Sequence, residues 1–321
     1  MQTTNIHKLH PTGSLTQLGA YRIESILGEG AAGIVYRARR HDAVDSNVVD
    51  GKADNSADSN DSRPTLVALK VLRPEVMTQP QVLACFQFEG RILSRLSHPG
   101  ILRVYETGMD DGRMFTAMEL LEGQSFERYL SAKKRLPLGE AIDLARQIAL
   151  ALEYLHNHGY AHRDIKPANL MFSNKGRLVL FDFGTVIRIK DGTDYEAGVY
   201  GTPAFLAPEQ IETDTKIDGR TDLYALGIVL YLMAVGRKPF YGTREDVLDA
   251  HVHLDPPPPS QFARIPQELE NVILKALAKR PEDRFATGAL FAEALTAVEK
   301  TLPPPQPSVW QRLTGWLRPK A

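Results

Sequence analysis

Short apolar runs separated by glycine and charged residues characterise the chain from residue 21 to about residue 121. Runs of this length, rich in branched and aromatic side chains, are typical of β-strands. Residues 80–96 differ, because Val82, Phe86 and Leu93 recur there at helical spacing. The pattern therefore predicts a strand-rich half with one helix, and its five strands are Tyr21–Leu27, Gly33–Ala38, Leu66–Leu72, Ile101–Thr107 and Met114–Leu121.

Beyond Gly123 the apolar period becomes that of α-helices. Residues 138–158 place Ala145, Ile148 and Leu152 on one helical face. Three more helices are predicted at residues 221–235, 266–279 and 286–300. The chain thus divides near residues 122 and 123 into a small β-rich part, residues 21–122, and a larger helical part, residues 123–300.

Two segments, residues 1–20 and 41–63, do not fit this pattern. Residues 1–20 are expected to form a loose arm. Residues 41–63 contain six Asp, four Ser and few apolar groups, which predicts a disordered acidic insertion because too little surface can be buried to offset ordering entropy. A calcium loop is the alternative, but Arg63 stands where the EF-hand spacing requires glycine.

The tail, residues 301–321, begins with a proline-rich spacer at residues 303–307. Trp310, Leu313 and Leu317 then fall on one helical face, with cationic side chains nearby at Arg312, Arg318 and Lys320. Docking on the rest of the chain or on a partner, fraying, and contact with a membrane surface are all compatible with such a segment. Membrane contact is the least favoured of the three.

Charge and cysteine content exclude several functions. The 321 residues carry 38 Lys and Arg against 39 Asp and Glu, a formal charge of −1, so no global attraction to nucleic acid is expected. The one cysteine, Cys85, excludes an internal disulfide and a cysteine-rich zinc site. The first twenty residues lack a secretory signal, and the longest apolar run, residues 223–235, is too short to span a bilayer. A cytoplasmic location is therefore expected.

A glycine-rich stretch, Gly28-Glu29-Gly30-Ala31-Ala32-Gly33, lies between the first two predicted strands. A dinucleotide motif would continue into a helix, whereas here a strand follows. The glycines therefore indicate a hairpin whose backbone can approach phosphate groups closely. In the third strand, Lys70 stands among apolar residues and needs a counter-charge, which Glu89 on the next helix can supply.

A second set of polar residues begins with His162-Arg163-Asp164-Ile165-Lys166-Pro167-Ala168-Asn169, and Asp182-Phe183-Gly184 follows. Asn169 and Asp182 offer the oxygen ligands that suit Mg²⁺. Asp164 can accept a hydrogen bond from an incoming hydroxyl, and Lys166 can neutralise charge on a transferring phosphoryl group. Further along, Glu209 is a candidate for a buried ion pair with Arg284, and Asp222 for capping backbone amides of the Asp164 loop.

Together these motifs resemble the eukaryotic-like (Hanks-type) serine/threonine protein kinases, closest to the bacterial branch, over about residues 21–300. The resemblance implies an α+β, bilobal protein-kinase fold: a small five-stranded antiparallel lobe with one main helix and a larger, mostly helical lobe, with ATP and Mg²⁺, or Mn²⁺ in its place, in the cleft. It implies that Asp164 is the catalytic base, that Lys166 contacts the γ-phosphate, and that Asn169 and Asp182 bind the metal. Lys70, paired with Glu89, would hold the other phosphates under the glycine loop of Gly28, Glu29, Gly30 and Gly33.

The same resemblance assigns the adenine pocket and the acceptor site. Val35 and Ala68 would cover the adenine, Met171 would lie beneath it, and Met118, Glu119 and Leu121 would form the gatekeeper and hinge. Lys166 and Thr202 indicate Ser/Thr rather than Tyr acceptors. Arg163 implies control by loop phosphorylation, for which Thr193 is the candidate. Ala32 departs from the family, because many kinases have an aromatic residue there.

Protein substrates, self-phosphorylation, a cognate phosphatase and a transient homodimer follow by analogy. An ATP-binding signalling scaffold with weak catalysis remains the alternative function. A small-molecule kinase is disfavoured, because such enzymes usually lack the Gly201–Glu209 segment that builds a peptide-binding ledge.

Overall fold

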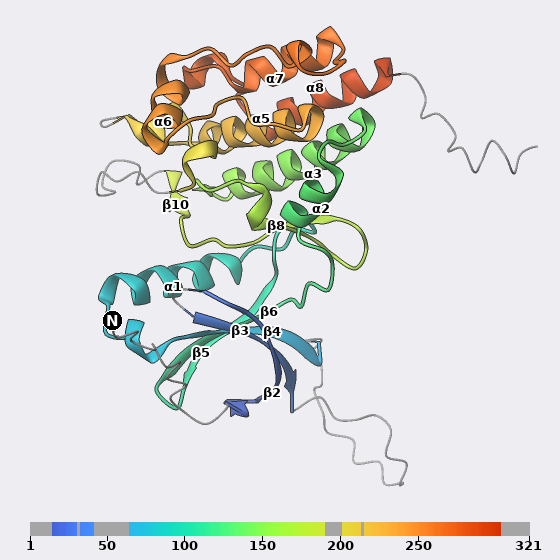
Figure 1. Cartoon of the computed structure of the whole chain (residues 1–321). Helices are drawn as coiled ribbons and strands as arrows, with labels where there is room; N and C mark the ends of the chain where they lie inside the picture. The colour runs from blue at the N-terminus through green and yellow to red at the C-terminus, as the bar shows by residue number, and fades with distance from the viewer. Residues whose placement is uncertain (1–14, 31–32, 42–63, 190–200, 213–214, 303–321) are drawn as a thin grey trace, which may run out of the picture. The chain divides into compact units, whose positions relative to one another are not determined.

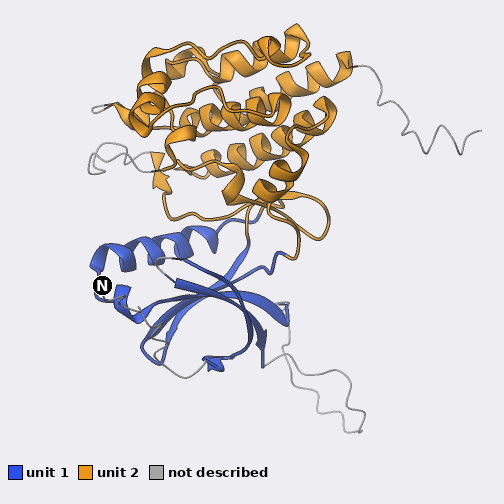
Figure 2. Ribbon diagram, viewed as in Figure 1, with its two compact units in different colours: residues 1–97, 103–121 blue, residues 98–102, 122–321 orange. Residues whose placement is uncertain are grey.

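A computed structural model describes residues 15–30, 33–41, 64–189, 201–212 and 215–302 (Figure 1). The chain forms two compact units (Figure 2). Unit 1 contains the residues up to Ser97 together with Arg103–Leu121, and unit 2 contains His98–Leu102 and the residues from Glu122 onward. The acidic insertion predicted at residues 41–63, except His41, and the tail from residue 303 lie outside the described residues.

Unit 1 is built on an antiparallel sheet of six strands in the order β1-β2-β3-β4-β6-β5. Its strands are β1 (Gln17–Leu18), β2 (Tyr21–Glu29), β3 (Gly33–Arg40), β4 (Leu66–Leu72), β5 (Val104–Asp110) and β6 (Arg113–Met118). The sequence predicted five strands and a loose arm at residues 1–20. Strand β1 corrects both predictions, because it is a sixth strand and it lies within residues 1–20. Leu18 is only 1% exposed and packs with Tyr21 and Phe115, so apolar burial holds this short strand in place.

The strand register gives the sheet two different faces. Val35 pairs with Lys70 and Ala68 with Met118, and residues two apart on β4 share a face, so these four side chains lie on the same side. The alternate residues of β4, such as Leu69, pack into the hydrophobic core on the opposite side. One face of the sheet therefore covers this core, and the other carries Lys70 next to a smaller buried cluster of Leu72, Phe86 and Met114.

Helix α1 (Pro80–Leu93) follows the short 3₁₀ turn η1 (Pro74–Val76) and packs against β5. It buries Phe86, Ile92 and Leu93 and ends three residues before the predicted end at residue 96. Gly90 allows close packing, because a Cβ there would lie 2.3 Å from the Thr107 hydroxyl oxygen. The helix is thereby fixed against the sheet at the residue next to Glu89.

Unit 2 is organised around α5 (Gly219–Val235), which is apolar on all sides and almost completely buried. It ends at Gly236 in the left-handed conformation that favours glycine at a helix end. Helices α3 (Leu138–Asn157) and α7 (Gln267–Ala276) pack on α5, and α8 (Gly288–Thr301) packs on both α3 and α7. These are the helices that the apolar period predicted.

Three helices of unit 2 were not predicted: the four-residue α4 (Pro208–Ile211), α2 (Phe126–Lys133) and α6 (Arg244–His253). Helices α2 and α6 are short and rich in charge; α6 has almost no apolar period, and in α2 only Phe126 and Leu130 are buried. Their N-terminal caps were visible, since Ser125 accepts from the amide of Arg128 and Thr243 from that of Asp246. None of the helices in the described part of the chain combines the length and apolarity that a membrane crossing requires.

Four short strands complete the framework of unit 2. The pairs are β7 (Tyr160–Ala161) with β10 (Ile187–Arg188), and β8 (Leu170–Phe172) with β9 (Leu178–Leu180). Residues 162–169 connect β7 to β8, and residues 181–186 connect β9 to β10. The two pairings therefore hold these two connecting loops in place.

Candidate active site

The carboxylate of Asp164 is the centre of a hydrogen-bonded group in unit 2. Lys166 Nζ lies 2.6 Å from Asp164 Oδ2, and Asn169 Nδ2 donates to the same oxygen at 2.9 Å and to the Asp164 carbonyl oxygen at 2.8 Å. Asp164 is 8% exposed. The Lys166 ammonium group and the Asn169 amide therefore hold the Asp164 carboxylate in one orientation, and a small part of Asp164 remains accessible to solvent.

Thr202, 38 residues further along the chain, lies against the same carboxylate. Its backbone amide donates to Asp164 Oδ1 at 3.3 Å, and its hydroxyl accepts from Lys166 Nζ at 2.8 Å. Because Oδ1 accepts only this long hydrogen bond among the described contacts, it retains capacity to accept from an incoming hydroxyl. The structure thus brings together Asp164, Lys166 and Thr202, which the sequence assigned to base, phosphate contact and acceptor site.

Asn169 and Asp182 offer oxygen ligands on neighbouring loops of unit 2. Asn169 uses its Nδ2 on Asp164, which leaves Oδ1 as its acceptor atom for a cation. Asp182 is exposed and has a φ of 65°, a left-handed conformation that few non-glycine residues adopt. No cluster of three or more His, Cys, Asp and Glu residues occurs in the described ranges. This donor set fits Mg²⁺ that takes its remaining oxygens from phosphates and water.

Asp222, on α5, anchors the loop that carries Asp164. It is fully buried and accepts from the amides of His162 at 2.8 Å and Arg163 at 2.7 Å, as the sequence predicted. His156 Nε2 lies 2.8 Å from the same carboxylate. Burial alone would raise the pKa of Asp222, but the hydrogen bond and charge of His156 and the neighbouring His162 lower it, so Asp222 stays ionised.

Arg163 has a φ of 68° and is held by contacts of both its backbone and its side chain. Its carbonyl accepts from Gln210 Nε2 at 2.9 Å, and its Nε donates to the carbonyl of Thr185 at 2.7 Å. Sequence reasoning missed the roles of Gln210 and His156. No local pattern marks them, because each acts on residues far away in the chain. Thr193, the predicted regulatory residue, lies outside the described residues.

In unit 1, Lys70 and Glu89 form the predicted ion pair. Lys70 Nζ lies 3.1 and 3.0 Å from the two carboxylate oxygens, with the side chains 26% and 13% exposed. Val35, Ala68 and Met118, assigned to the adenine pocket, share the face of Lys70, and Glu119 donates its amide to the Arg103 carbonyl. The other two assigned residues are Leu121, at the end of unit 1, and Met171, on β8 of unit 2.

The glycine-rich stretch lies where β2 turns into β3. A Cβ at Gly33 would lie 2.4 Å from the carbonyl oxygen of Val71, so strand packing by itself requires this glycine. Around Gly28 the space is open, because a Cβ there would meet no atom of the described residues within 4 Å. The Glu29 carboxylate pairs with Arg73 at 2.9 Å. An open backbone at Gly28 is what close approach of a phosphate requires.

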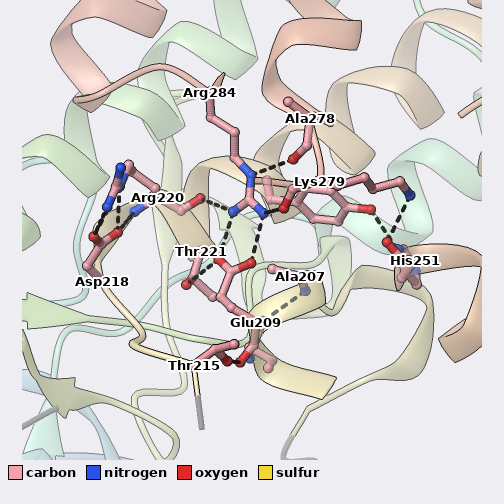
Figure 3. A network of polar contacts seen from close by, with 12 residues as sticks. Ala207, Glu209, Thr215, Asp218, Arg220, Thr221, His251, Ala278, Lys279 and Arg284 are labelled. Atoms are coloured by element: carbon pink, nitrogen blue, oxygen red, sulfur yellow. Dashed lines mark hydrogen bonds and ion pairs between the residues drawn. The ribbon is translucent and has the colours of Figure 1, made fainter. Parts of the chain in front are cut away.

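Glu209 and Arg284 form a fully buried ion pair in unit 2 (Figure 3). Two parallel hydrogen bonds of 2.7 and 2.8 Å join them, and their side chains are 4% and 0% exposed. Arg284 also donates to the carbonyls of Ala278, Lys279 and Arg220, and Glu209 accepts from Thr221. The pair thus connects α4 (Pro208–Ile211) to α5 and to the 3₁₀ turn η6 (Pro281–Asp283).

Beside this pair, the buried side chains of His251 and Tyr224 lie against the half-buried Lys279. Tyr224 Oη lies 2.9 Å from His251 Nδ1, and Lys279 Nζ donates to the carbonyls of Ala250 and His251. Burial, followed by the charge of Lys279, lowers the pKa of His251 to about 4, and burial lowers that of Lys279 to about 8. These groups therefore favour their neutral forms more than they would in water.

His251 is expected to make the protein sensitive to mild acid. The pKa of His251 is about 4 in the folded protein, and its ordinary value is 6.5. As the pH falls, a proton therefore binds this histidine in the unfolded chain before it binds in the folded protein. The contribution of His251 to folding stability is fully present above pH 6.5 and is lost between pH 6.5 and 4. At about 1.4 kcal/mol per pH unit, this group costs about 2 kcal/mol at pH 5. His251→Gln is expected to show a correspondingly smaller decrease in unfolding free energy between pH 7.5 and 5, measured by denaturant titration. His253→Gln, on the same helix but exposed, is the control and should behave like the wild type.

Comparison with known families identifies the class of protein. Residues 51–296 match the protein kinase domain, and the chain belongs to the protein kinase family. It is 35% identical over 295 residues to the serine/threonine-protein kinase Pkn3 of Myxococcus xanthus, covering 87% of this chain and 50% of Pkn3. It is 37% identical over 251 residues to PknB of Mycobacterium leprae, covering 76% of this chain and 40% of PknB. The chain thus spans half or less of the length of these relatives.

The fold agrees with solved structures of the same family. The PknI kinase domain of Mycobacterium tuberculosis superposes with a TM-score of 0.65 at 28% sequence identity, over 89% of this chain and 99% of that domain. The described residues therefore adopt the protein-kinase fold that the sequence motifs implied. The six-stranded sheet with α1 and the helical unit around α5 are its two parts.

Proposed function

We propose that this chain is a serine/threonine protein kinase that transfers the γ-phosphoryl group of ATP to hydroxyls of protein substrates. Family membership implies ATP and a divalent cation; we propose Mg²⁺, with Mn²⁺ able to substitute. The observation that carries the proposal is the group of Asp164, Lys166 and Thr202, joined by hydrogen bonds of 2.6 and 2.8 Å through one ammonium group. A base, a cation and the acceptor segment are thereby fixed together before any substrate arrives.

Each residue of this group supplies a separate part of the reaction. Asp164 accepts the hydrogen bond of the incoming Ser or Thr hydroxyl and orients its oxygen toward the γ-phosphorus; as the new P–O bond forms and the bond to ADP breaks, the hydroxyl proton passes to Asp164. Lys166 offsets the negative charge on the transferring group. Asn169 and Asp182 would hold the cation, which neutralises the phosphates. Asp222 fixes the backbone of the loop that carries Asp164, so the loop needs little rearrangement before the reaction.

Lys70 supplies the nucleotide part of the proposal. Its bond to Glu89 orients the ammonium group without neutralising all of its donors, since a lysine ammonium has three N–H groups. We propose that these act on the same ATP whose γ-phosphoryl group Asp164 directs to its acceptor. The intact pair favours an active kinase over the alternative of an ATP-binding scaffold with weak catalysis.

Removal of the Lys70 ammonium group or of the metal is expected to stop phosphate transfer. Wild-type protein incubated with γ-labelled ATP and Mg²⁺ should label a generic basic protein and itself on Ser or Thr, and excess chelator should abolish labelling until Mg²⁺ is restored. Lys70→Met should reduce transfer by roughly a hundredfold or more. Peptide mapping then tests whether self-labelling falls within residues 185–202, where Thr193 is the proposed site.

The matched control for this experiment is Lys175→Met, which removes an exposed lysine in the turn between β8 and β9. It should transfer phosphate at the wild-type rate. Wild-type protein that binds ATP but labels neither acceptor would favour the scaffold. Wild-type turnover by Lys70→Met would refute the role of the lysine.

A further inference from the structure

Lys238 lies beside the part of unit 2 that the proposed function assigns to the acceptor. Its ammonium nitrogen is 6.0 Å from the centre of the Phe205 ring. Phe205 ends the 3₁₀ turn η4 (Pro203–Phe205), and its amide donates to the carbonyl of Thr202 at 2.9 Å. We refer to Thr202 and this turn as the acceptor segment. Since Thr202 also donates to Asp164, one short turn connects the proposed base to the position of Lys238.

The packing of η4 on α6 holds this arrangement together. The two elements are in contact, and the backbone of η4 lies close enough to the buried His251 to act on its pKa. After burial and the charge of Lys279, the charge of Lys238 also lowers the pKa of this histidine, so Lys238 lies near it too. The backbone amide of Lys238 donates to the Tyr241 hydroxyl at 2.9 Å. Lys238 is therefore anchored next to the structure that supports the acceptor segment.

The charge of Lys238 is available to a substrate. Lys238 is half-buried, and it forms no ion pair with the carboxylates in the described ranges. On α6, Asp246 accepts from the backbone amide of Thr243, and Asp249 lies 2.9 Å from His253, so these two carboxylates have partners of their own. Solvent and salt screen a partly buried charge less than a fully exposed one. A carboxylate that reaches Lys238 therefore gains a counter-charge which the described residues do not supply.

We propose that Lys238 selects protein acceptors in which an Asp or Glu lies within about four positions of the phosphorylated Ser or Thr. The two ends of a turn lie within about 7 Å of each other, so the far end of the acceptor segment is close to Asp164. An extended peptide advances about 3.3 Å per residue, so a side chain a few residues from the accepting hydroxyl can reach Lys238. This inference rests on the proposed kinase function and names the substrate class of the same site.

The same geometry disfavours acceptors with a cation at that position. A Lys or Arg of the substrate would face Lys238 directly, and a second ammonium group, that of Lys166, lies 2.8 Å from the Thr202 hydroxyl. Like charges brought together weaken binding and so discriminate between partners. The expected preference is severalfold, so a generic basic protein remains an acceptor, although a slower one than an acidic protein.

A set of peptides that differ at one position measures this preference. A peptide with a single Ser is made with Asp, Ala or Lys at each position from four before to four after the Ser, and kcat/KM is determined for each with ATP and Mg²⁺. At the positions that face Lys238, the wild type should prefer Asp over Lys by roughly three- to tenfold, the size expected of one partly exposed charge pair and its reversal. The preference should decrease at high salt.

Three variants of Lys238 test whether this residue causes the preference. Lys238→Met should bring the ratio of Asp to Lys peptides close to one, Lys238→Glu should invert it, and Lys238→Arg, which keeps the charge, should retain it. Each ratio is measured within one protein, so a general loss of activity in a variant cancels. The matched control is Lys300→Glu, which makes the same charge change at an exposed site on α8 and should keep the wild-type ratio.

The outcomes separate this inference from the proposed function. A wild type that phosphorylates all the peptides without a charge preference would overturn the inference and leave the kinase function standing. A Lys238→Glu variant with the wild-type preference would do the same. A wild type that binds ATP and transfers phosphate to none of the peptides would overturn the proposed function, and the substrate class with it.

Discussion

Asp164→Asn is expected to lower the rate of phosphate transfer to a protein acceptor by about 10²–10⁴-fold, the range in which a positioned general base contributes. The substitution keeps the shape of the side chain and one oxygen. It removes the negative charge that Lys166 faces at 2.6 Å and the capacity to take the hydroxyl proton. Steady-state labelling with γ-labelled ATP measures the effect, which should lie in kcat, because Asp164 acts on the acceptor and not on the nucleotide.

Two controls separate loss of chemistry from loss of structure in this variant. The melting temperature of Asp164→Asn should stay close to that of the wild type, since neutral amides can still accept from Asn169. Nucleotide affinity, measured by titration, should change little. A variant with normal folding and nearly normal turnover would show that Asp164 is not the base, and the proposed role of the whole group would fall with it.

Arg284→Met is expected to cause the largest loss of stability. The substitution leaves the Glu209 carboxylate buried without its cation, and breaking a buried pair in this way costs about 3–5 kcal/mol. For a domain of this size, such a loss lowers the melting temperature by roughly 10 °C. Thermal unfolding followed by circular dichroism measures it.

The double variant Glu209→Leu/Arg284→Met should be more stable than Arg284→Met alone. Replacing both charges removes the desolvated carboxylate, although the carbonyls that Arg284 served lose a donor, so recovery should be partial. Arg280→Ala serves as the control, because its ion pair with Glu282 is largely exposed and should contribute nothing measurable. Equal losses from Arg280→Ala and Arg284→Met would contradict the importance of burial.

The apolar pattern predicted helices and strands well where apolar residues dominate the sequence, and poorly elsewhere. The bounds of β4 were predicted without error, and α5 was found within two residues of its start, because apolar residues dominate both segments. Helix α6 was missed because its charged sequence carries little apolar period, and α2 because it is short, with only Phe126 and Leu130 buried, so that tertiary packing stabilises it. Strand β1 was missed because a two-residue strand has no pattern of its own, and only the burial of Leu18 reveals it.

The candidate site shows the same division. Lys70, Glu89, Asp164 and Asn169 were identified from residue type and spacing in the sequence. The supporting residues His156 and Gln210 were not, because each is identified only by the distant backbone or side chain that it bonds.

The sequence by itself determined which chemical groups this protein has available and the family to which it belongs, because catalytic chemistry restricts residue type at short, fixed spacings. Only the tertiary structure decided which supporting groups hold the site: His156 with Asp222 over 66 residues, and Gln210 with Arg163 over 47. Such contacts form when buried charges and amides find partners, wherever in the chain those partners are, since leaving them unpaired is costly. The need to pair buried polar groups depends on their three-dimensional positions, which residue spacing along the chain does not reveal.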